Sequence, residues 1–331
     1  MRRALGALLL ALAAVGGGAW TYVGWALGPV GTGPAVQVTI PQGASTPQIA
    51  QTLRERGLIR DAWAFRMLAR WQGLEARLQA GEYRFAPDEG ARRILSRLAA
   101  GDVVRYPVTI PEGYTVAQIG EALARAGLAD RERFLRFAHE ADRFWIPQMR
   151  GNATGSLEGY LFPDTYLLPR GLPEERIVQM MVNRFREAAG ALLAGPLPLG
   201  LTAHEVVTVA SLVEREARLA PERARIAGVI YNRLQRGMRL EVDATVLYAL
   251  GRHKDVVLYR DLEVDSPYNT YRFAGLPPGP IANPGLAAIE AAVRPEAHDF
   301  LYYVARTDGS HVFSRTLEEH NRAIRAIHGD R

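Results

Sequence analysis

The chain contains VTIPQGASTPQIAQTLRERGLI at residues 38–59 and repeats this pattern as VTIPEGYTVAQIGEALARAGLA at residues 108–129. Each copy predicts a strand, a Pro-x-Gly turn and then an amphipathic helix. Ser45 or Thr115 begins the helix as its N-cap, and Gly57 or Gly127 ends it. The repeat therefore predicts two small substructures of the same design.

A second helix is expected in each copy, near residues 61–71 and 130–140. The first copy continues into GEYRF at 81–85, which we expect to pair with the strand at 36–40, and then into a helix near 89–99. The corresponding strand of the second copy is expected at EGYLF, 158–162. Such a strand–helix–helix–strand unit resembles the LysM carbohydrate-binding module. A duplicated scaffold with no ligand is an equal alternative, because a fold does not imply a function.

The N-terminal segment is almost wholly apolar from residue 4 to residue 30, and after Arg2 and Arg3 no charge occurs until Arg54. About 20 apolar residues suffice to cross a bilayer. The aromatic residues Trp20, Tyr22 and Trp25 lie toward the far end, and the arginine pair marks a cytoplasmic side. We therefore expect a transmembrane helix at 4–28, with a cleaved signal peptide as the main alternative. Residues 1–3 would then be cytoplasmic, and the rest would lie outside the cytoplasm of a single-pass inner-membrane protein.

Composition narrows the function classes. The chain has 331 residues, of which 48% are hydrophobic and 23% charged, so it is globular. It has no cysteine, which excludes disulfides, thiolate catalysis and cysteine-based metal sites. Its net charge is +5, but Lys254 is the only lysine and no basic run occurs, so we expect no nucleic-acid partner. The histidines show no ligand spacing, and we expect neither metal nor cofactor.

The C-terminal part reads as helices around a long loop. Thr202 and Glu205 form a capping box for a helix that runs to about 218, and Pro221 begins the next helix, which ends at Gly237. Asp243 is expected to cap a short helix that ends at Gly251. A proline-rich irregular stretch follows at 261–285, and such long loops are usually functional. A helix after Asn283-Pro284, a hairpin around Asp308-Gly309 and a final helix capped by Thr316 complete the chain.

Two glutamates lie near the end of the helix that Thr202 begins. At about 100° per residue, Glu214 lies some 80° from the centre of the apolar face, and Glu216 lies roughly 160° from Glu214. The two carboxylates therefore cannot form one dyad. Glu214 borders the core, so burial raises its pKa toward the range of a general acid. The alternative is a surface glutamate paired with Arg215 or Arg218.

Several motifs resemble the MltG (YceG-like) family of endolytic murein transglycosylases. These are SLEGYLFPDTY (156–166), ASLVEREA (210–217), YNRL (231–234), GMRLEVDATVLYALG (237–251), SPYNTY (266–271), GLPPGPIANPG (275–285) and HVFS with EHN near the end. The resemblance covers about residues 36–327. It implies that Glu214 is catalytic; Arg215 stands where the family commonly has lysine. Candidate substrate-binding residues on these motifs are Glu158, Asp164, Thr165, Tyr166, Asn232, Asp243, Tyr248, Tyr268, Asn269 and Thr270. For each of them a structural role in a loop or cap is the alternative.

The resemblance implies a lytic transglycosylase that cleaves the bond between N-acetylmuramic acid and N-acetylglucosamine without water and leaves 1,6-anhydro ends. It also implies nascent peptidoglycan strands as substrate, with a role in ending strand elongation, and peptidoglycan synthases such as penicillin-binding proteins as partners. The other function that the residues allow is a non-catalytic glycan-binding scaffold for those synthases. Aminodeoxychorismate lyase, a label that similar sequences carry, is rejected because its Schiff-base lysine would have to be Lys254, in a polar turn.

The expected fold class is α+β. It comprises a transmembrane helix at 4–28, a linker at 29–35, a LysM-like module at 36–105 and a YceG-like catalytic domain at 106–331. That domain is expected to be mainly helical, with a long loop and a β-hairpin, and its start, 106–170, repeats the LysM-like pattern.

Overall fold

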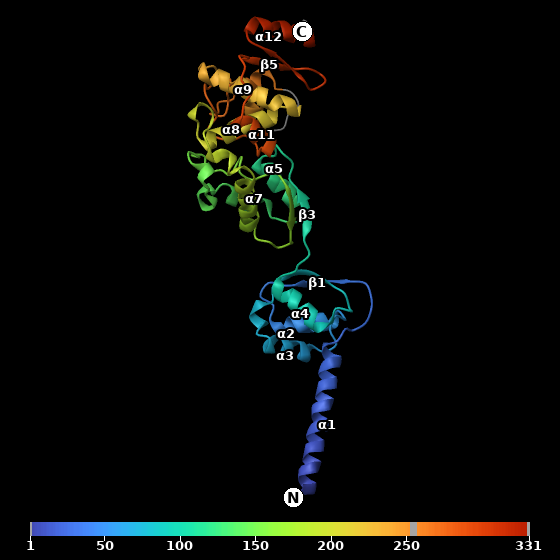
Figure 1. Ribbon diagram of the computed structural model, residues 1–331. Coiled ribbons are helices and arrows are strands. Elements are labelled where there is room, and N and C mark those ends of the chain that lie inside the picture. Colours follow the sequence, from blue (N-terminus) through green and yellow to red (C-terminus); the bar gives the residue numbers. More distant parts are fainter. Residues whose placement is uncertain (1, 252–256, 330–331) are drawn as a thin grey trace. The chain divides into compact units, whose positions relative to one another are not determined.

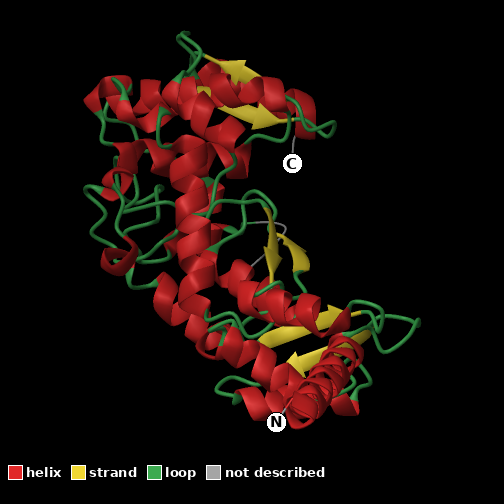
Figure 2. Cartoon of the chain, turned by 60° about the horizontal axis from the view of Figure 1, so that its bottom comes forward, coloured by secondary structure: helices red, strands yellow, loops and turns green. Residues whose placement is uncertain are grey.

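The computed structural model describes residues 2–251 and 257–329, and it describes the side chains of the first helix from residue 13 onward. Lys254 lies outside the described residues. The chain forms two compact units: Met1–Tyr106 with Leu167–Gly171, and Pro107–Tyr166 with Leu172–Arg331. Helices predominate in both units, and the strands pair as three two-stranded sheets, drawn in yellow in Figure 2.

The first unit contains one antiparallel strand pair and four α-helices along its described residues (Figure 1). The elements are α1 (Arg2–Leu27), β1 (Val36–Ile40), α2 (Thr46–Glu55), α3 (Ala62–Trp71), the 3-10 turn η1 (Glu75–Arg77), β2 (Gly81–Phe85) and α4 (Gly90–Ala100). In the register of the sheet, Val36 faces Phe85 and Ile40 faces Gly81. The expected pairing of residues 81–85 with 36–40 is confirmed.

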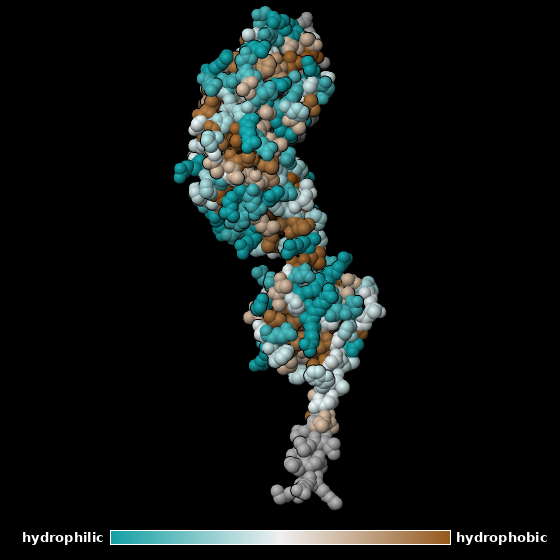
Figure 3. Space-filling model, viewed as in Figure 1, coloured by the Kyte–Doolittle hydropathy of each residue, from teal (hydrophilic) through white to brown (hydrophobic). Residues whose placement is uncertain are grey.

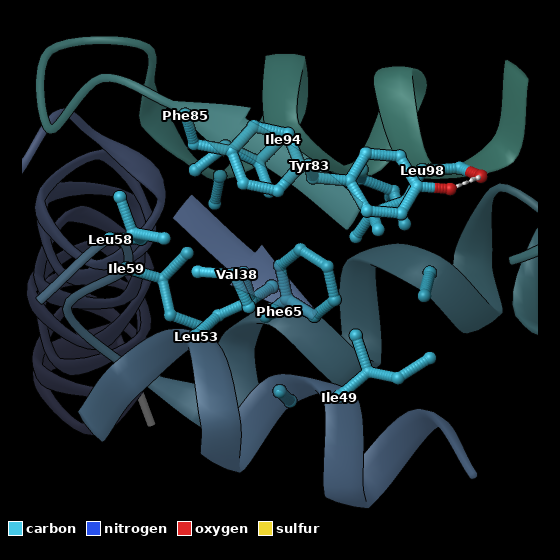
Figure 4. Close-up of a cluster of buried hydrophobic side chains, with 14 of the residues drawn as sticks. Val38, Ile49, Leu53, Leu58, Ile59, Phe65, Tyr83, Phe85, Ile94 and Leu98 are labelled. Carbon is cyan, nitrogen blue, oxygen red and sulfur yellow. Dashed lines mark hydrogen bonds between the residues drawn. The ribbon is translucent and has the colours of Figure 1, made fainter. Parts of the chain in front are cut away.

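The core of the first unit is formed by hydrophobic residues at every second position of its strands and at every third or fourth position of its helices. Val38 of β1 and Tyr83 and Phe85 of β2 point inward at alternate positions, as a half-buried strand requires. Ile49 and Leu53 of α2 lie four residues apart and share the buried face of their helix (Figure 4). The hydroxyl of Tyr83 donates to the carbonyl oxygen of Gln79 at 2.8 Å, so the buried phenol keeps a hydrogen bond.

The structure corrects the expected fold class at its first element. Among the described residues, no helix is both long and apolar enough to cross a membrane. A helix does form at Arg2–Leu27, but its described side chains include the glycines at 16–18 and Thr21, which add little hydropathy. Its last turn packs within the first unit, where Ala26 is fully buried and the Tyr22 hydroxyl donates to Asp61 at 3.1 Å. The transmembrane helix predicted at 4–28 is therefore wrong.

The second unit begins with the second copy of the repeat. Its elements are β3 (Tyr106–Thr109), α5 (Val116–Arg125), α6 (Arg131–Ala138), η2 (Ala141–Phe144), η3 (Pro147–Met149), β4 (Thr165–Leu168), α7 (Glu174–Ala189), η4 (Leu192–Ala194) and η5 (Pro198–Gly200). The first residue of β3 and the last two of β4 are counted with the first unit. β3 pairs with β4. Thr115 caps α5 by accepting from the Gln118 amide at 3.2 Å, and Gln118 accepts in return from the Thr115 amide at 2.9 Å. Ser45 and Gln48 form the corresponding box in the first copy, so this part of the repeat is reproduced.

The strand expected at 158–162 is a turn instead, and the paired strand starts at Thr165. The amide of Tyr160 donates to the Leu157 carbonyl at 2.9 Å, which closes the turn. Gly159 has a φ of 88°, and a Cβ there would lie 2.5 Å from Pro280 Cγ. Only glycine accepts both the left-handed backbone and the close approach of Pro280. Residues 158–162 therefore form a buried turn, and their alternation of residue types does not distinguish this turn from a strand.

The rest of the second unit surrounds one central helix, α8. Its elements are α8 (Ala203–Glu216), η6 (Ala220–Glu222), α9 (Arg223–Gln235), α10 (Asp243–Leu250), η7 (Tyr259–Glu263), α11 (Leu286–Val293), β5 (Tyr302–Ala305), β6 (His311–Ser314) and α12 (Leu317–His328). α8 packs against both α9 and α11. The predicted hairpin is confirmed, with Tyr302 opposite Ser314. Asp243 is the first residue of α10 rather than its cap, which is Val242.

The exposed surface is mixed in character. On the face drawn in Figure 3, hydrophilic residues cover most of both units, and hydrophobic residues show between them in small groups. This is ordinary for a folded domain, because much of any protein surface is apolar.

The repeat makes a stability prediction. Leu53 and Leu123 occupy equivalent positions and are both fully buried. Replacing either by alanine leaves a cavity, and we expect each to lose about 2–5 kcal/mol of stability. Hydrogen exchange should accelerate in residues 36–106 for Leu53→Ala and in the second unit for Leu123→Ala. Arg54→Ala, on the exposed face, is the control. Equal acceleration in both units from either variant would show that the two copies do not have separate cores.

Candidate active site

Helix α8 places two glutamates in its last turn. It begins with a capping box in which Thr202 Oγ1 accepts from the Glu205 amide and Glu205 accepts from the Thr202 amide at 2.7 Å. Its residues from 206 to 213 are all buried. The helix ends at Glu216, so Glu214 and Glu216 emerge where the buried stretch stops. The expected capping box is confirmed.

The Glu214 carboxylate meets the start of α11. Its Oε2 accepts a hydrogen bond of 3.0 Å from the amide of Gly285, which is the N-cap residue of α11. The turn after β3 lies on another side, since a Cβ on Gly113 would be 3.5 Å from Glu214 Cγ. The guanidinium of Arg215 donates to the Gly113 carbonyl at 3.4 Å and holds this turn against the helix. Glu214 is thus partly buried between α11 and the β3–α5 turn.

The environment of Glu214 favours its protonated form. Burial raises the pKa of this carboxyl above its ordinary value, and the negative charge of Glu112 raises it further. The Gly285 amide and the charges of Arg223 and Arg215 lower the pKa, but the net direction is upward. Nε of Arg223 is buried and has no hydrogen-bond partner among the described residues. A raised pKa makes this carboxyl a better proton donor near neutral pH than an ordinary glutamate.

Asn283 links the β3–α5 turn to the segment that precedes α11. Its side-chain oxygen accepts from the Leu161 amide at 2.9 Å, and its amide group donates to the Tyr114 carbonyl and to Glu158, each at 2.9 Å. Its backbone also pairs with Gly113 and Tyr114, both at 2.9 Å. The residue is fully buried. Because Gly285 follows two residues later, these bonds fix the position of the amide that meets Glu214.

Glu158 is hydrogen-bonded to Asn283 and to the start of α5. Its carboxylate accepts from the Val116 amide at 3.0 Å, at the start of α5, and from Tyr248 at 3.4 Å as well as from Asn283. Burial raises its pKa to about 8, although these hydrogen bonds lower it. Only 5% of the residue is exposed. The structure therefore gives Glu158 a supporting position, and its oxygens already have partners.

Tyr248 and Tyr268 form a pair next to Glu158. Their ring centroids are 4.9 Å apart. Both rings are partly buried, and burial raises the pKa of each phenol. The structure thus brings Glu158, Tyr248 and Tyr268 together in one cluster. Asn283 connects this cluster to the β3–α5 turn beside Glu214.

Most other candidates hold loops in place. Asn269 donates to the carbonyls of Leu262 and Val264 at 2.8 Å each and is fully buried. Thr270 accepts from the Val242 amide at 3.0 Å. Asn232 donates to the carbonyl of His298 at 2.8 Å. For these three residues the observed contacts agree with the alternative of a structural role in a loop or cap.

The candidates around β4 and Asp243 contact other elements. Asp164 is ion-paired with Arg184 at 2.6 Å, Thr165 contacts Thr109 at 2.9 Å, and the Tyr166 hydroxyl donates to the Phe162 carbonyl. Asp243 is exposed and accepts from the Tyr271 hydroxyl at 2.6 Å. Asp243 also influences Glu216, since its charge raises the pKa of that carboxyl. None of these four is brought to Glu214 by a hydrogen bond or ion pair of the described residues.

Glu216 faces a different part of the unit from Glu214. Its Oε2 accepts from the Tyr303 hydroxyl at 3.1 Å. Burial raises its pKa to about 7 against the opposing effects of Tyr303 and the Ala244 amide. The predicted separation of the two glutamates is therefore what the structure shows, but Glu216 is more buried than a surface position suggests.

Sequence reasoning missed Glu112. The two copies of the repeat differ in their Pro-x-Gly turn, which is Pro-Gln-Gly at 41–43 and Pro-Glu-Gly at 111–113. The carboxylate of Glu112 lies against Gly285, where a Cβ would collide with it. The change from glutamine to glutamate at this one position was the available signal. Asn283 and Gly285 were noted only as the start of a helix.

Neither a metal-binding cluster among the described residues nor the cavity at the start of α8 coincides with Glu214. The described residues contain no group of three or more His, Asp or Glu side chains that could hold a metal ion. A cavity of about 730 Å³ lies at the opposite end of α8, between Thr202, His204 and Pro278. The Glu214 carboxyl thus lies at a helix N-terminus, with the charges of Glu112, Arg215 and Arg223 nearby.

Comparison with known proteins identifies the class. A family model described as the YceG-like family matches residues 38–326, and the chain belongs to this family. An endolytic murein transglycosylase of Bacillus subtilis (strain 168) is 36% identical over 326 residues, covering 93% of this chain and 89% of that protein. One of Streptococcus pneumoniae serotype 2 (strain D39 / NCTC 7466) is 32% identical over 320 residues, covering 87% of this chain and 58% of that protein.

A solved structure agrees with these relatives. The crystal structure of a YceG-like protein from Listeria monocytogenes superposes with a TM-score of 0.58 at 35% sequence identity. The match covers 88% of this chain and all of that chain. The fold described above is therefore shared with an experimentally determined member of the family.

The buried Glu158 predicts how stability depends on pH. Its pKa of about 8 in the folded chain lies above the ordinary value of 4.5, so the folded chain binds more protons than the unfolded chain between these limits. This contribution to stability is fully present below pH 4.5 and is lost as the pH rises through 8. Glu158→Gln keeps the hydrogen-bonding shape without the charge. We expect the stability of the variant, measured by urea unfolding, to exceed that of the wild type increasingly from pH 5 to pH 9. A constant difference would contradict the assignment.

Proposed function

We propose that this chain is an endolytic murein transglycosylase in which Glu214 is the single acid and base. The relatives with this name and the shared family support the reaction class. The observation that carries the residue assignment is the bond from the Gly285 amide to a partly buried Glu214 whose pKa is raised. The substrate is a peptidoglycan strand, cleaved between N-acetylmuramic acid and N-acetylglucosamine.

In the first step, protonated Glu214 donates its proton to the glycosidic oxygen. The bond between that oxygen and C1 of the muramic residue breaks, and positive charge develops at C1. Glu214 becomes a carboxylate, which the Gly285 amide at the α11 N-terminus and the charges of Arg215 and Arg223 stabilise. These groups lower the free energy of the carboxylate relative to that of the protonated acid. They therefore lower the barrier to proton transfer.

In the second step, the Glu214 carboxylate removes the proton of the muramic 6-hydroxyl. The oxygen closes on C1 and forms the 1,6-anhydro ring, and Glu214 is protonated again. No water is consumed, and one carboxyl serves both proton transfers. A hydrolase normally needs a second carboxylate to activate water or attack carbon. The negative charge of Glu112, which acts on Glu214, is the protein group that we propose to stabilise positive charge at C1, in addition to the acetamido group of the substrate.

The proposal also includes the surroundings of the enzyme. Because peptidoglycan lies outside the cytoplasm, the chain acts there, beside the peptidoglycan synthases whose nascent strands it shortens. A reporter fused after Arg331 should be active only outside the cytoplasm, and activity inside would contradict this location. Crosslinking in growing cells should recover penicillin-binding proteins with the chain, and their absence would remove them as partners.

Substituting Glu214 tests the chemistry directly. Glu214→Gln keeps the length and the bond to Gly285 but deletes the titratable proton, so we expect folding to survive and turnover to fall by about 10²–10⁴-fold or more. The measurement is release of anhydromuramyl-ended fragments from purified glycan strands. Glu290→Gln makes the same change at an exposed position of α11 and should retain full activity. Near-normal turnover by Glu214→Gln would leave the glycan-binding scaffold as the better description.

Removing the charge of Glu112 should shift the pH profile. Its charge raises the pKa of Glu214, so Glu112→Gln lowers that pKa. The acid must be protonated to act, and activity therefore declines as the pH rises through its pKa. We expect the alkaline limb of kcat/KM to move to lower pH in Glu112→Gln, with no shift in Glu290→Gln. An unchanged limb with unchanged turnover would show that Glu112 plays no part in the site.

A further inference from the structure

A second cavity lies on the Glu216 side of α8, in the same unit. It has a volume of about 550 Å³, within the range of about 300–1,000 Å³ typical of small-molecule sites. The end of α8, the start of α10, the β5 strand and α12 all contribute to its wall. None of the reaction described above uses this cavity, and Glu214 is not part of its lining.

The groups on its wall are arranged for hydroxyl-bearing ligands. Tyr303 donates to Glu216 at 3.1 Å, and Tyr271 donates to Asp243 at 2.6 Å. A carboxylate has about four lone-pair positions, so each of these two can accept further hydrogen bonds. The phenol oxygens that donate to them can accept in turn. The wall therefore offers paired acceptors and donors, as alcohol groups require.

His320 of α12 supplies an unused polar atom at this cavity. Its Nδ1 is buried and has no hydrogen-bond partner among the described residues. Its ring stacks on Tyr302 with centroids 5.2 Å apart, and the guanidinium of Arg233 lies 4.9 Å from the centroid of the Tyr302 ring. These contacts fix the imidazole in place. Leaving a buried nitrogen unpaired costs free energy, so His320 adds to this wall a polar group that no described residue satisfies.

The charges of the cavity favour a neutral ligand. Arg233 donates from Nε and Nη1 to the carbonyls of Leu301, Arg239 and Leu240 and is ion-paired with Glu241, and the carboxylates of Glu216 and Asp243 on the same wall disfavour an anion. Glu216 already accepts from Tyr303, and Asp243 from Tyr271, which leaves them suited to hydroxyl donors. Sites built to hydrogen-bond hydroxyl groups discriminate strongly in favour of ligands that carry them.

We infer that this cavity is a saccharide subsite that takes one neutral N-acetylhexosamine unit of the glycan strand. The inference rests on the proposed function, because the strand that reaches Glu214 supplies this unit. Glu216 is two residues beyond Glu214, about 3 Å along the helix axis, and faces the other flank. A strand bound at both places is held on two sides of the helix end. Cleavage within a strand, rather than at its end, requires such contacts beyond the bond that breaks.

Binding of a short neutral glycan tests the subsite. The probe is triacetylchitotriose, added to the full-length Glu214→Gln chain carrying fluorinated tyrosine, with the Tyr303 signal assigned by Tyr303→Phe. We expect the Tyr303 signal to shift on saturation. We also expect Asn321→Trp, which fills the cavity from α12, to weaken the binding reported by this signal by roughly tenfold or more. Arg325→Trp introduces the same ring at an exposed position of α12 outside the lining and should bind normally.

The outcomes separate this inference from the proposed function. A Tyr303 signal that does not move at saturating triose, or normal binding by Asn321→Trp, would overturn the subsite, whatever the activity of Glu214→Gln. Turnover by Glu214→Gln would overturn the catalytic assignment and leave the binding result intact. A shift produced by calcium or magnesium ions, but not by the triose, would identify a cation site and also overturn the subsite.

Discussion

The hydrogen bonds of Asn283 are the constraint on which the candidate site depends. One buried side chain joins Leu161, Glu158 and Tyr114, and its backbone pairs with Gly113. Only an amide provides both the acceptor for the Leu161 N–H and the donors for the other two oxygens. An aspartate would place its charge against the Tyr114 carbonyl and Glu158. Because these bonds fix Gly113 and Gly285 together, they also set the space in which Glu214 lies.

In the last turn of α8, burial and the amides of neighbouring helix N-termini have opposite effects on the pKa values of two glutamates. Burial raises the pKa of both Glu214 and Glu216, while the Gly285 and Ala244 amides, at the starts of α11 and α10, lower them. The balance matters for a group that must first hold a proton and then release it. Burial alone would raise the pKa of the acid further, and the amides alone would lower it below the ordinary value. The same helix end thus places the proposed acid, Glu214, on one flank and the second cavity on the other.

Local signals in the sequence predicted local structure well. The caps at Ser45, Thr115, Thr202 and Thr316 and the β5–β6 hairpin depend on residues a few positions apart, and all of them form. The cap expected at Asp243 is Val242, one residue earlier, and the larger errors occur where packing between distant residues decides. The end of α1 packs on residues around Asp61, and the run at 158–162 turns because Pro280 approaches Gly159. Most polar residues on the family motifs likewise have structural partners that lie far along the chain.

The sequence by itself determined the duplicated strand–helix–helix unit, the family motifs and the position of Glu214 at the border of an apolar helix face. These follow from periodicity, capping and residue order, which are properties of neighbouring residues. Tertiary structure alone decided that Glu112 and Gly285, separated from Glu214 by 102 and 71 positions, complete its surroundings. The pKa of a side chain is set by its burial and by the charges close to it in space. In this chain those neighbours come from segments far apart in the sequence, and the local pattern of each segment does not reveal which residues it will contact.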